Sequence, residues 1–443
     1  MYYTYLIAGS DFLLLIVYAI VVYFILRLFL FKKLDKKHSR LFLVVYILKV
    51  FCAVLMSVMP VFYWGLSDNF HYFEEAKNLL KLINTDFSNI KYFFLPAEQY
   101  NEIIKLDNEL AGTVSSGNEG NLFAAKFAAL LYPISLGRFL IVNFFFAVFA
   151  MIGQFKFFIA ISNRYPHIKK QVAIAILLMP SVLIYSSFFN KETLCMAFMG
   201  FGFYNYFQVV NKKNRILNAL FLLINIFFIA IIKPYIAVAF LAAVIIAYIM
   251  KFIIHFWRKS IFSKIAVTIL ISVVLGLFFA NLSFFDSYIA DFADRSNFFQ
   301  EQYNNYEQTS AFEFGEVETS FAGLVQKAPL GIYTTYFRPQ LWEVNKPIIL
   351  FSALESFFIF ILAFWAIVMR FRSIGALFRN DLLINIAFYY VLIFGVIVGL
   401  TTFNFGSLVR YKIPAVPFLM LFIFVLLHYK VPKKQVEIIT TMG

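Results

Sequence analysis

Acidic residues directly follow a long hydrophobic segment that ends near residue 65, and they are the first side chains in the sequence that could carry out chemistry. Asp68 comes first, and a carboxylate at the mouth of a membrane span can act as a general base towards a bound hydroxyl. With Glu74 or Glu75 it can instead hold a divalent cation. His71, one turn further on, can hydrogen-bond a substrate. Structural roles stay open for both, with Asp68 as a helix cap and His71 as an interfacial side chain.

Basic residues at four other turns form the second candidate group. They are Lys191 with Glu192, Lys233 with Tyr235, Arg338 with Trp342, and Arg410 with Lys412. Charged groups at such turns cost free energy unless they pair or bind a ligand. Lys191 therefore either pairs with Glu192 or binds a phosphate at head-group level, and Lys233 is either a ligand or a lysine that reaches the interface along its apolar stem. We expect at least three of the four positions to contribute a cation to one cavity, where they would neutralise a polyprenyl phosphate or diphosphate.

Hydrophobic segments must position these residues, and they run almost the whole length of the 443-residue chain. The composition is 62% hydrophobic and the mean hydropathy is +0.81, far above the soluble globular range. A spanning helix needs roughly 20 mostly apolar residues, and the chain has about eleven such segments. They lie at about 7–31, 41–65, 139–161, 172–189, 193–210, 216–232, 235–254, 265–283, 349–369, 383–402 and 412–428. The sequence therefore predicts an all-α polytopic integral membrane protein, with residues 1–443 as a single membrane domain.

Lysine and arginine clusters at alternate connections predict the orientation of the chain. They lie at about 32–40, 164–170, 212–215, 251–264, 370–379 and 430–434. If every cluster is cytoplasmic, the N-terminus lies outside and the C-terminus inside. The 60 Phe, with many Ile, Asn and Lys, indicate an AT-rich bacterial genome, so we expect the bacterial cytoplasmic (inner) membrane.

Two long connections then face outward, at residues 66–137 and 284–347. In the first, residues 69–83 place apolar side chains near one face, which predicts an amphipathic helix along the membrane surface. Further helical stretches are expected at about 97–110 and 121–131. The second connection is acidic and aromatic at first and becomes a denser motif from residue 333 onward. Two such loops on one side of a helical bundle can roof a cavity at the boundary between membrane and water.

Several functional classes are excluded by what the sequence lacks. It contains no Walker loop, dinucleotide fingerprint, zinc-ligand pair or defensible Ser/His/Asp order, so no cofactor is expected apart from a possible divalent cation. The net charge of +14 belongs to the membrane flanks and to contact with the lipid bilayer rather than to nucleic-acid binding. The two cysteines lie in predicted spans and indicate neither a metal site nor a disulfide.

With these residues in place, the chain resembles the membrane-integral glycosyltransferases of the GT-C fold, especially bacterial members found among polysaccharide-synthesis genes. The motifs that carry the resemblance are Asp68 with Tyr72, Glu74 and Ala76; Pro180, Tyr185-Ser-Ser187 and Asn190-Lys-Glu192; Lys233-Pro-Tyr235; Phe337-Arg-Pro339 with Leu341-Trp-Glu343; and Arg410-Tyr-Lys-Ile-Pro414. The layout is also similar, because long outer loops follow the family's first and seventh core spans, which match segments 41–65 and 265–283 here. The first segment of this chain is an addition to that layout.

The resemblance implies a polyprenyl-phosphate-linked sugar donor, a glycan or lipid acceptor, inversion at the anomeric carbon and an acidic base in the first outer loop, where Asp68 matches. Many members carry two neighbouring acidic residues there, whereas Asp68 stands between Ser67 and Asn69. The alternative is an O-antigen or exopolysaccharide polymerase or ligase that uses polyprenyl-diphosphate glycans and outer-loop arginines such as Arg338 and Arg410. A transporter or flippase predicts more charge within the spans and leaves the two large loops unexplained.

Overall fold

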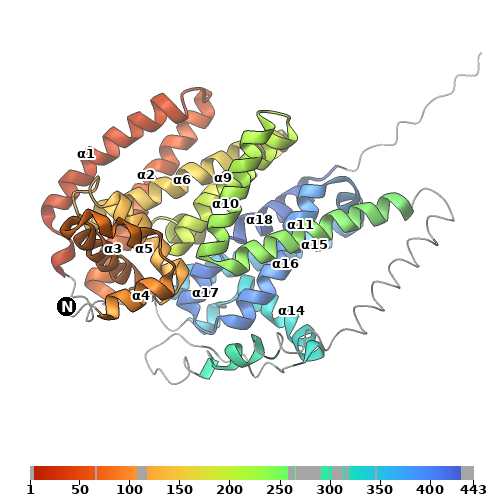
Figure 1. The fold of residues 1–443 in the computed structure, drawn as a ribbon. Helices are drawn as coiled ribbons and strands as arrows, with labels where there is room; N and C mark the ends of the chain where they lie inside the picture. Colours follow the sequence, from red (N-terminus) through yellow and green to blue (C-terminus); the bar gives the residue numbers. More distant parts are fainter. Residues whose placement is uncertain are drawn as a thin grey trace, which may run out of the picture.

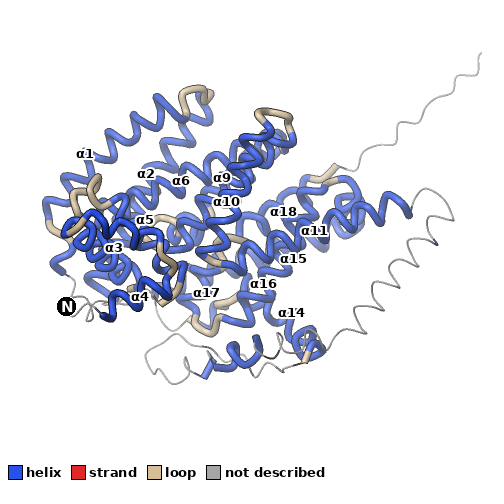
Figure 2. Tube along the Cα trace, viewed as in Figure 1, coloured by secondary structure: helices blue, strands red, loops and turns tan. Residues whose placement is uncertain are grey.

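A computed structural model describes residues 4–64, 67–106, 117–257, 320–344 and 347–430, together with residue 265 and a few positions between 290 and 318. Within these residues every regular element is a helix and there is no strand (Figure 1, Figure 2). The predicted all-α class is therefore confirmed for the described part of the chain.

Seven of the described helices are long and apolar enough to cross a membrane, which makes this a multi-pass membrane protein. They are α1 (Gly9–Ile25) with the π-helical turn η2 (Leu26–Leu30), α2 (Lys36–Met59) with η3 (Pro60–Trp64), α6 (Phe139–Arg164), α10 (Arg215–Ile232), α11 (Pro234–Trp257), α15 (Pro347–Asn380) and α16 (Leu382–Thr401). An eighth span is formed if α17 (Phe405–Tyr411) and α18 (Val416–His428), which meet at a bend of 63°, count as one broken helix.

The other three of the eleven expected segments do not form long apolar helices among the described residues. Segment 172–189 is broken into α7 (Lys169–Ala173), η6 (Ile174–Leu178) and α8 (Pro180–Tyr185). The break comes at Pro180, which has no N–H to continue the helix. Segment 193–210 becomes α9 (Lys191–Val210), a 20-residue helix that is less apolar than the seven spans. Segment 265–283 lies almost entirely outside the described residues.

Helices α6 and α9 form the centre of the bundle, where two glycines bring their backbones into contact. A Cβ atom on Gly153 would lie 2.3 Å from the carbonyl oxygen of Ala197, and one on Gly200 would meet the backbone of Gly153 at 2.2 Å. Small residues allow such close approach inside membranes, where van der Waals packing rather than the hydrophobic effect joins helices. The N-terminal helix α1 lies at the edge of the bundle. Only 11% of the most apolar 18-residue stretch of this span is buried in the protein, against 72% of the corresponding stretch of α6.

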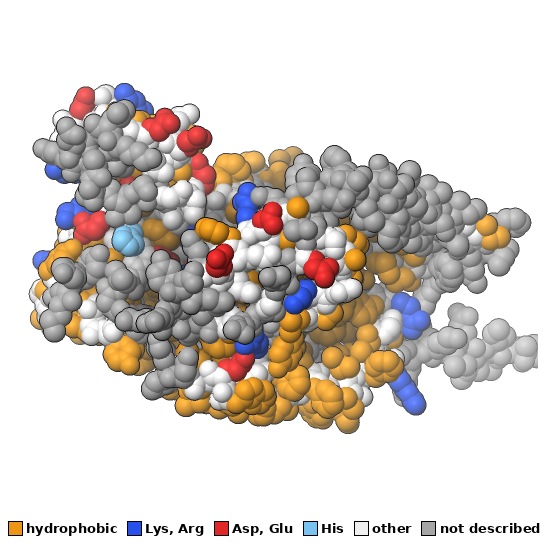
Figure 3. Space-filling model, turned by 90° about the horizontal axis from the view of Figure 1, so that it is seen from below, with side chains coloured by type: hydrophobic (Ala, Val, Ile, Leu, Met, Phe, Trp, Pro, Cys, Tyr) orange, Lys and Arg blue, Asp and Glu red, His pale blue; other side chains and the backbone are white. Residues whose placement is uncertain are grey.

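Shorter helices gather at one end of the bundle, which we call the loop end. They are α3 (Asp68–Thr85), the 3-10 segment η4 (Phe87–Phe94), α4 (Ala97–Leu106), α5 (Glu119–Leu131), α14 (Phe321–Phe337) and η7 (Leu341–Glu343). In Figure 1, α4 and α14 lie towards the lower edge, and α3 and α5 lie at the left. Seen from below, acidic and basic side chains are scattered between apolar ones (Figure 3).

The apolar face of α3 packs against protein, which differs from the expected position on the membrane surface. The rings of Phe70 and Phe73 contact Phe139 at the start of α6, with centroids 5.4 and 5.3 Å apart. Ala76 and Leu79 are fully buried along the same face, and α3 packs along α5. The same pattern of apolar residues suits burial in lipid or burial against protein, because the lipid and the protein interior are similarly apolar.

The opposite end of the bundle carries the connections that contain basic residues. There Arg164 lies 3.8 Å from Asp381, between α15 and α16, and the Tyr165 hydroxyl donates to the same carboxylate at 2.9 Å. Gln171 contacts His428, the last residue of α18, at 3.4 Å. Arg164 and these neighbours therefore lie at the end of the bundle away from the short helices.

Candidate functional site

A polar cavity of about 410 Å³ opens at the loop end, where the ends of several helices meet. Its walls come from the start of α5, the start of α9, the turn between α10 and α11, the end of α16 and the end of α17. The lining residues are Asn118, Glu119, Gly120, Lys191, Ile231, Ile232, Lys233, Pro234, Tyr235, Val398, Thr401, Thr402 and Tyr411. Three of the residues expected from the sequence, Lys191, Lys233 and Tyr235, are among them.

The start of α5 forms one wall because of two local sequence features. Asn118 caps the helix, since its side chain accepts a hydrogen bond from the backbone N–H of Asn121 at 3.0 Å. Gly120 allows α5 to touch the turn between α10 and α11, because a Cβ atom there would lie 2.3 Å from the carbonyl oxygen of Ile232. The acidic side chain of Glu119 turns towards α4, where it accepts a hydrogen bond from the Ala97 N–H at 2.7 Å.

Lys191 reaches across the cavity to α5. Its ammonium donates to Asn121 Oδ1 at 2.6 Å, and the Tyr72 hydroxyl of α3 donates to the same oxygen at 3.0 Å. Asn190 places Lys191 there by capping α9, since its side chain accepts from the Thr193 N–H at 2.6 Å. Lys191 forms no ion pair with a carboxylate within the described part of the chain. Its neutral partner leaves its charge available to an anion in the cavity.

Glu192, the next residue, lies on the far side of this wall and pairs with two cations. It is 1% exposed and forms a hydrogen-bonded ion pair with Lys233, while Arg410 Nε lies 3.8 Å from the same carboxylate oxygen. Lys233 also stacks over the ring of Tyr411, with its ammonium 3.8 Å from the centroid. The lysine is held at this point because α10 ends at Ile232 and Pro234 begins α11.

Arg410 connects Glu192 to Asp68, the carboxylate singled out first. The guanidinium lies 3.2 Å from Asp68 Oδ2, and the Asp68 side chain is 53% exposed. Asp68 also interacts electrostatically with Lys191 and with the Tyr72 hydroxyl. The cap of α3 is Ser67, so Asp68 is not the cap residue of that helix. These five charged residues, Asp68, Lys191, Glu192, Lys233 and Arg410, are called the cavity group below.

The cation at Arg338 belongs to a separate arrangement, which corrects the expected convergence of at least three positions on the cavity. Arg338 Nε donates to Glu343 Oε1 at 2.7 Å, and its guanidinium lies 4.1 Å from the ring centroid of Phe312. The buried Lys412 donates to Ser356 Oγ at 2.8 Å. Only Lys191 and Lys233 line the cavity, with Arg410 behind them. Arg338 does not contribute to the cavity because it pairs instead with Glu343, five residues further along the chain.

The remaining acidic residues of α3 do not join Asp68. Glu74 pairs with Lys77 at 3.5 Å and accepts from the Tyr5 hydroxyl at 3.4 Å. Glu75 is two turns from Asp68, about 10 Å along the helix axis, which is too far for one cation with oxygen ligands at about 2.4 Å. In the described parts of the chain no three His, Cys, Asp or Glu side chains are placed to hold a metal ion.

Burial gives Glu75 a different property. Its side chain faces Tyr100 of α4, and no cation pairs with it among the residues that the structure describes. Burial raises the pKa of Glu75 to about 7, because the ionised form loses its water. His71 and Trp342 are exposed, Trp342 to 77%, and neither is among the residues that line the cavity.

Several residues of the site escaped the sequence analysis, most clearly Asn118, which lines the cavity, and Asn121, which accepts the hydrogen bond from Lys191. The available signal was an asparagine just before an apolar helical stretch, which is typical of a helix cap. That signal locates the start of α5 but does not indicate which helix it meets. No family model, no curated protein and no solved structure matches this chain.

Proposed function

We propose that this protein is a membrane glycosyltransferase that transfers a sugar from a polyprenyl-phosphate-linked donor to a glycan or lipid acceptor. The observation that carries the proposal is the cavity group itself. It joins a half-exposed carboxylate, Asp68, through Arg410 and Glu192 to Lys233, which with Lys191 lines a polar cavity at one end of the membrane-spanning helices. Such a site offers a base for a hydroxyl and positive charge for a phosphate at head-group depth.

The chemistry follows from the charges that the reaction develops. The acceptor hydroxyl attacks the anomeric carbon of the donor sugar, and Asp68 takes the hydroxyl proton as the new C–O bond forms. The bond between the anomeric carbon and the phosphate oxygen breaks, and its electron pair leaves with the phosphate. Lys191 and Lys233 stabilise the negative charge on this leaving group. Attack opposite the leaving group inverts the anomeric centre.

Arg410 acts in this proposal as a positioning residue. It bridges Asp68 and the buried Glu192, so it holds the base relative to the two lysines. An acceptor hydroxyl would approach Asp68 from its exposed side. Because a base must lie within hydrogen-bond reach of the proton that it takes, the orientation of the carboxylate matters as much as its presence.

The proposal also assigns the orientation of the protein. The loop end faces the outside of a bacterial cytoplasmic membrane, the N-terminus lies outside, and the C-terminus lies in the cytoplasm. The location of Arg164 at the opposite end supports this assignment through the positive-inside rule. A GT-C fold, with Lys36–Tyr63 as the first core span, is the architecture that we propose for the whole chain.

The direct test is Asp68→Asn, with Asp86→Asn as the matched control at the other end of α3. Asparagine keeps the size and one oxygen but cannot take the proton. We expect transfer from polyprenyl phosphates carrying radiolabelled hexoses to fall by about 10²-fold or more, the scale for loss of a general base. Asp86 caps η4 at the surface, where its side chain accepts from the Ser88 N–H, so its variant should keep full transfer.

Normal transfer by a correctly inserted Asp68→Asn variant would contradict Asp68 as the base. It would favour the alternative enzyme, a polymerase or ligase for polyprenyl-diphosphate glycans that depends on Arg338 and Arg410.

A further inference from the structure

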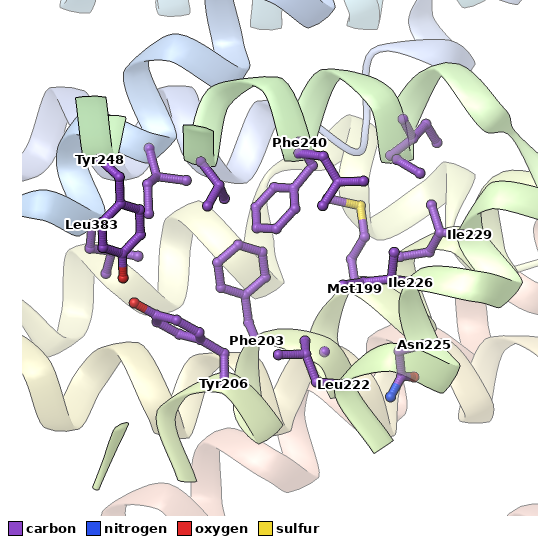
Figure 4. Close-up of a pocket in the computed structure, with 16 residues that line it drawn as sticks. Met199, Phe203, Tyr206, Leu222, Asn225, Ile226, Ile229, Phe240, Tyr248 and Leu383 are labelled. Atoms are coloured by element: carbon purple, nitrogen blue, oxygen red, sulfur yellow. The ribbon is translucent and has the colours of Figure 1, made fainter. Parts of the chain in front are cut away.

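A second cavity, of about 270 Å³, lies inside the helical bundle between α9, α10, α11 and α16. Figure 4 shows its walls, which are almost wholly apolar and include Met199, Phe203, Ile229 and Phe240. The amide of Asn225 does not make the wall polar, because its Nδ2 donates to a carbonyl of its own helix at 2.6 Å. A cavity of this kind fits hydrocarbon and excludes charged or sugar-like groups.

The apolar cavity and the polar cavity follow the same seam between α10 and α11. Ile232 and Tyr235 line the polar cavity, whereas Ile229 and Ile236, their neighbours along the two helices, line the apolar one. Lys233 lies between the helices at the polar end of this seam. A molecule that follows the seam therefore meets positive charge at one end and only apolar side chains below it.

The apolar cavity extends well into the depth of the membrane. It is lined along α11 from Ile236 to Tyr248, about 18 Å at 1.5 Å per residue, which is more than half of a hydrocarbon core of about 30 Å. At the far end the hydroxyls of Tyr206 and Tyr248 point towards one another (Figure 4). Leu241, also on its wall, is 44% exposed, so the cavity has a side that faces surrounding lipid.

We propose that this cavity binds the isoprenoid chain of the donor lipid while its phosphate lies at Lys191 and Lys233. The inference rests on the proposed function and adds where the chain of the substrate lies. One chain of a single-chain lipid can enter between the four helices, whereas a two-chain phospholipid would have to leave a chain outside. The charge of the lysines suits the phosphate, and the apolar wall begins about one helical turn from Lys233, at Ile229 and Ile236.

The test is photo-crosslinking of the purified full-length protein in nanodiscs with a long-chain isoprenoid phosphate that carries a diazirine in its chain. We expect mass spectrometry to find labels on cavity residues such as Met199, Phe203 and Phe240. Val244→Trp, on the cavity wall, should reduce this labelling by about fivefold or more, because the indole occupies the space of the chain. Val238→Trp is the matched control on the same helix, since Val238 is 59% exposed and does not line the cavity.

Labels confined to the lipid-facing side of α11, with no effect of Val244→Trp, would overturn the inference. It would equally be overturned if a diazirine-bearing phosphatidylglycerol labelled the cavity and unlabelled isoprenoid phosphate did not displace it. Asp68→Asn separates this result from the proposed function. Loss of transfer in that variant without cavity labelling of the native protein rejects only the chain-binding inference, whereas cavity labelling together with normal transfer by the variant rejects only the proposed catalytic role.

Discussion

Two groups of charged residues at the loop end both combine lysine and arginine with carboxylates, and they differ in whether a cation lacks a carboxylate partner. The cavity group has three cations and two carboxylates. Lys233 and Arg410 pair with the carboxylates, whereas Lys191 donates to the amide of Asn121. The second group has two of each, since Arg338 pairs with Glu343 and Lys412 lies near Glu355. Only the cavity group combines surplus positive charge with a cavity. An isolated basic residue in sequence therefore says little about ligand binding until its partners are known.

The second group has a clear structural role. The carbonyl of Arg338 accepts hydrogen bonds from Ser356 of α15 at 3.1 Å and from Lys412, just after α17, at 3.5 Å. Glu355 in turn accepts from the Ser181 N–H of α8 at 2.6 Å. These bonds join four elements around the end of α14. Closed sets of this kind stabilise packing, whereas an open set can exchange a partner for a ligand.

The largest loss of stability is expected when Glu192, the most buried carboxylate of the two groups, is replaced. Glu192→Gln leaves Lys233 and Arg410 without their shared partner, and removing one member of a buried ion pair costs about 3–5 kcal/mol. Glu343→Gln, in the second group, removes a partly exposed partner and should cost only about 1–2 kcal/mol. Thermal unfolding of both variants in detergent measures the difference. Equal losses would contradict the central position of Glu192.

A second variant tests whether the surplus cation serves a ligand. Lys191→Met removes a charge that is paired only with an amide, so the fold should persist while kcat/KM for donor falls by about 10²-fold, the scale for loss of one group that stabilises a leaving anion. Asn121→Ala is the control, because it removes the amide partner but keeps the charge. Full activity of Lys191→Met would reject a phosphate at this position.

Glu75 extends the comparison to a buried carboxylate without a cation. Burial raises its pKa to about 7 in the folded protein from an ordinary value of 4.5, so the folded state binds the proton more tightly than the unfolded state. The resulting stability is fully present below pH 4.5 and is lost as the pH rises to about 7. Glu75→Gln should therefore stabilise the protein by about 1–3 kcal/mol at pH 8 and by little at pH 4.5. Unfolding curves with the same pH dependence as the native protein would rule this out.

The smallest effect is expected at Arg338. Arg338→Lys keeps the charge but loses the planar fork that binds Glu343, so stability should fall by about 0.5–1.5 kcal/mol. Sugar transfer should stay within about threefold, because the residue lies outside the polar cavity. A large loss of transfer with an intact fold would assign the chemistry to the second group and favour the polymerase or ligase alternative.

The sequence correctly indicated which regions are helical and apolar, and it was less informative about how they continue. Eight of the eleven segments correspond to long apolar helices or to the bent pair α17–α18. Segment 172–189 has enough apolar residues, yet Pro180 breaks it, because total hydrophobicity does not report backbone continuity. The amphipathic stretch that starts at residue 69 is helical, but its apolar face packs against α5 and the start of α6 rather than along the membrane surface.

The sequence by itself determined that this protein crosses a membrane several times and that charged residues lie at the turns. Both properties are local, since hydrophobicity over about 20 residues and the place of a charge between two segments need no distant partner. Only the tertiary structure decided that Arg410 joins Asp68 to Glu192 while Arg338 binds Glu343. Ion pairing falls off within a few ångströms, so it depends on which helix ends packing brings together, and these ends come from segments far apart in the chain.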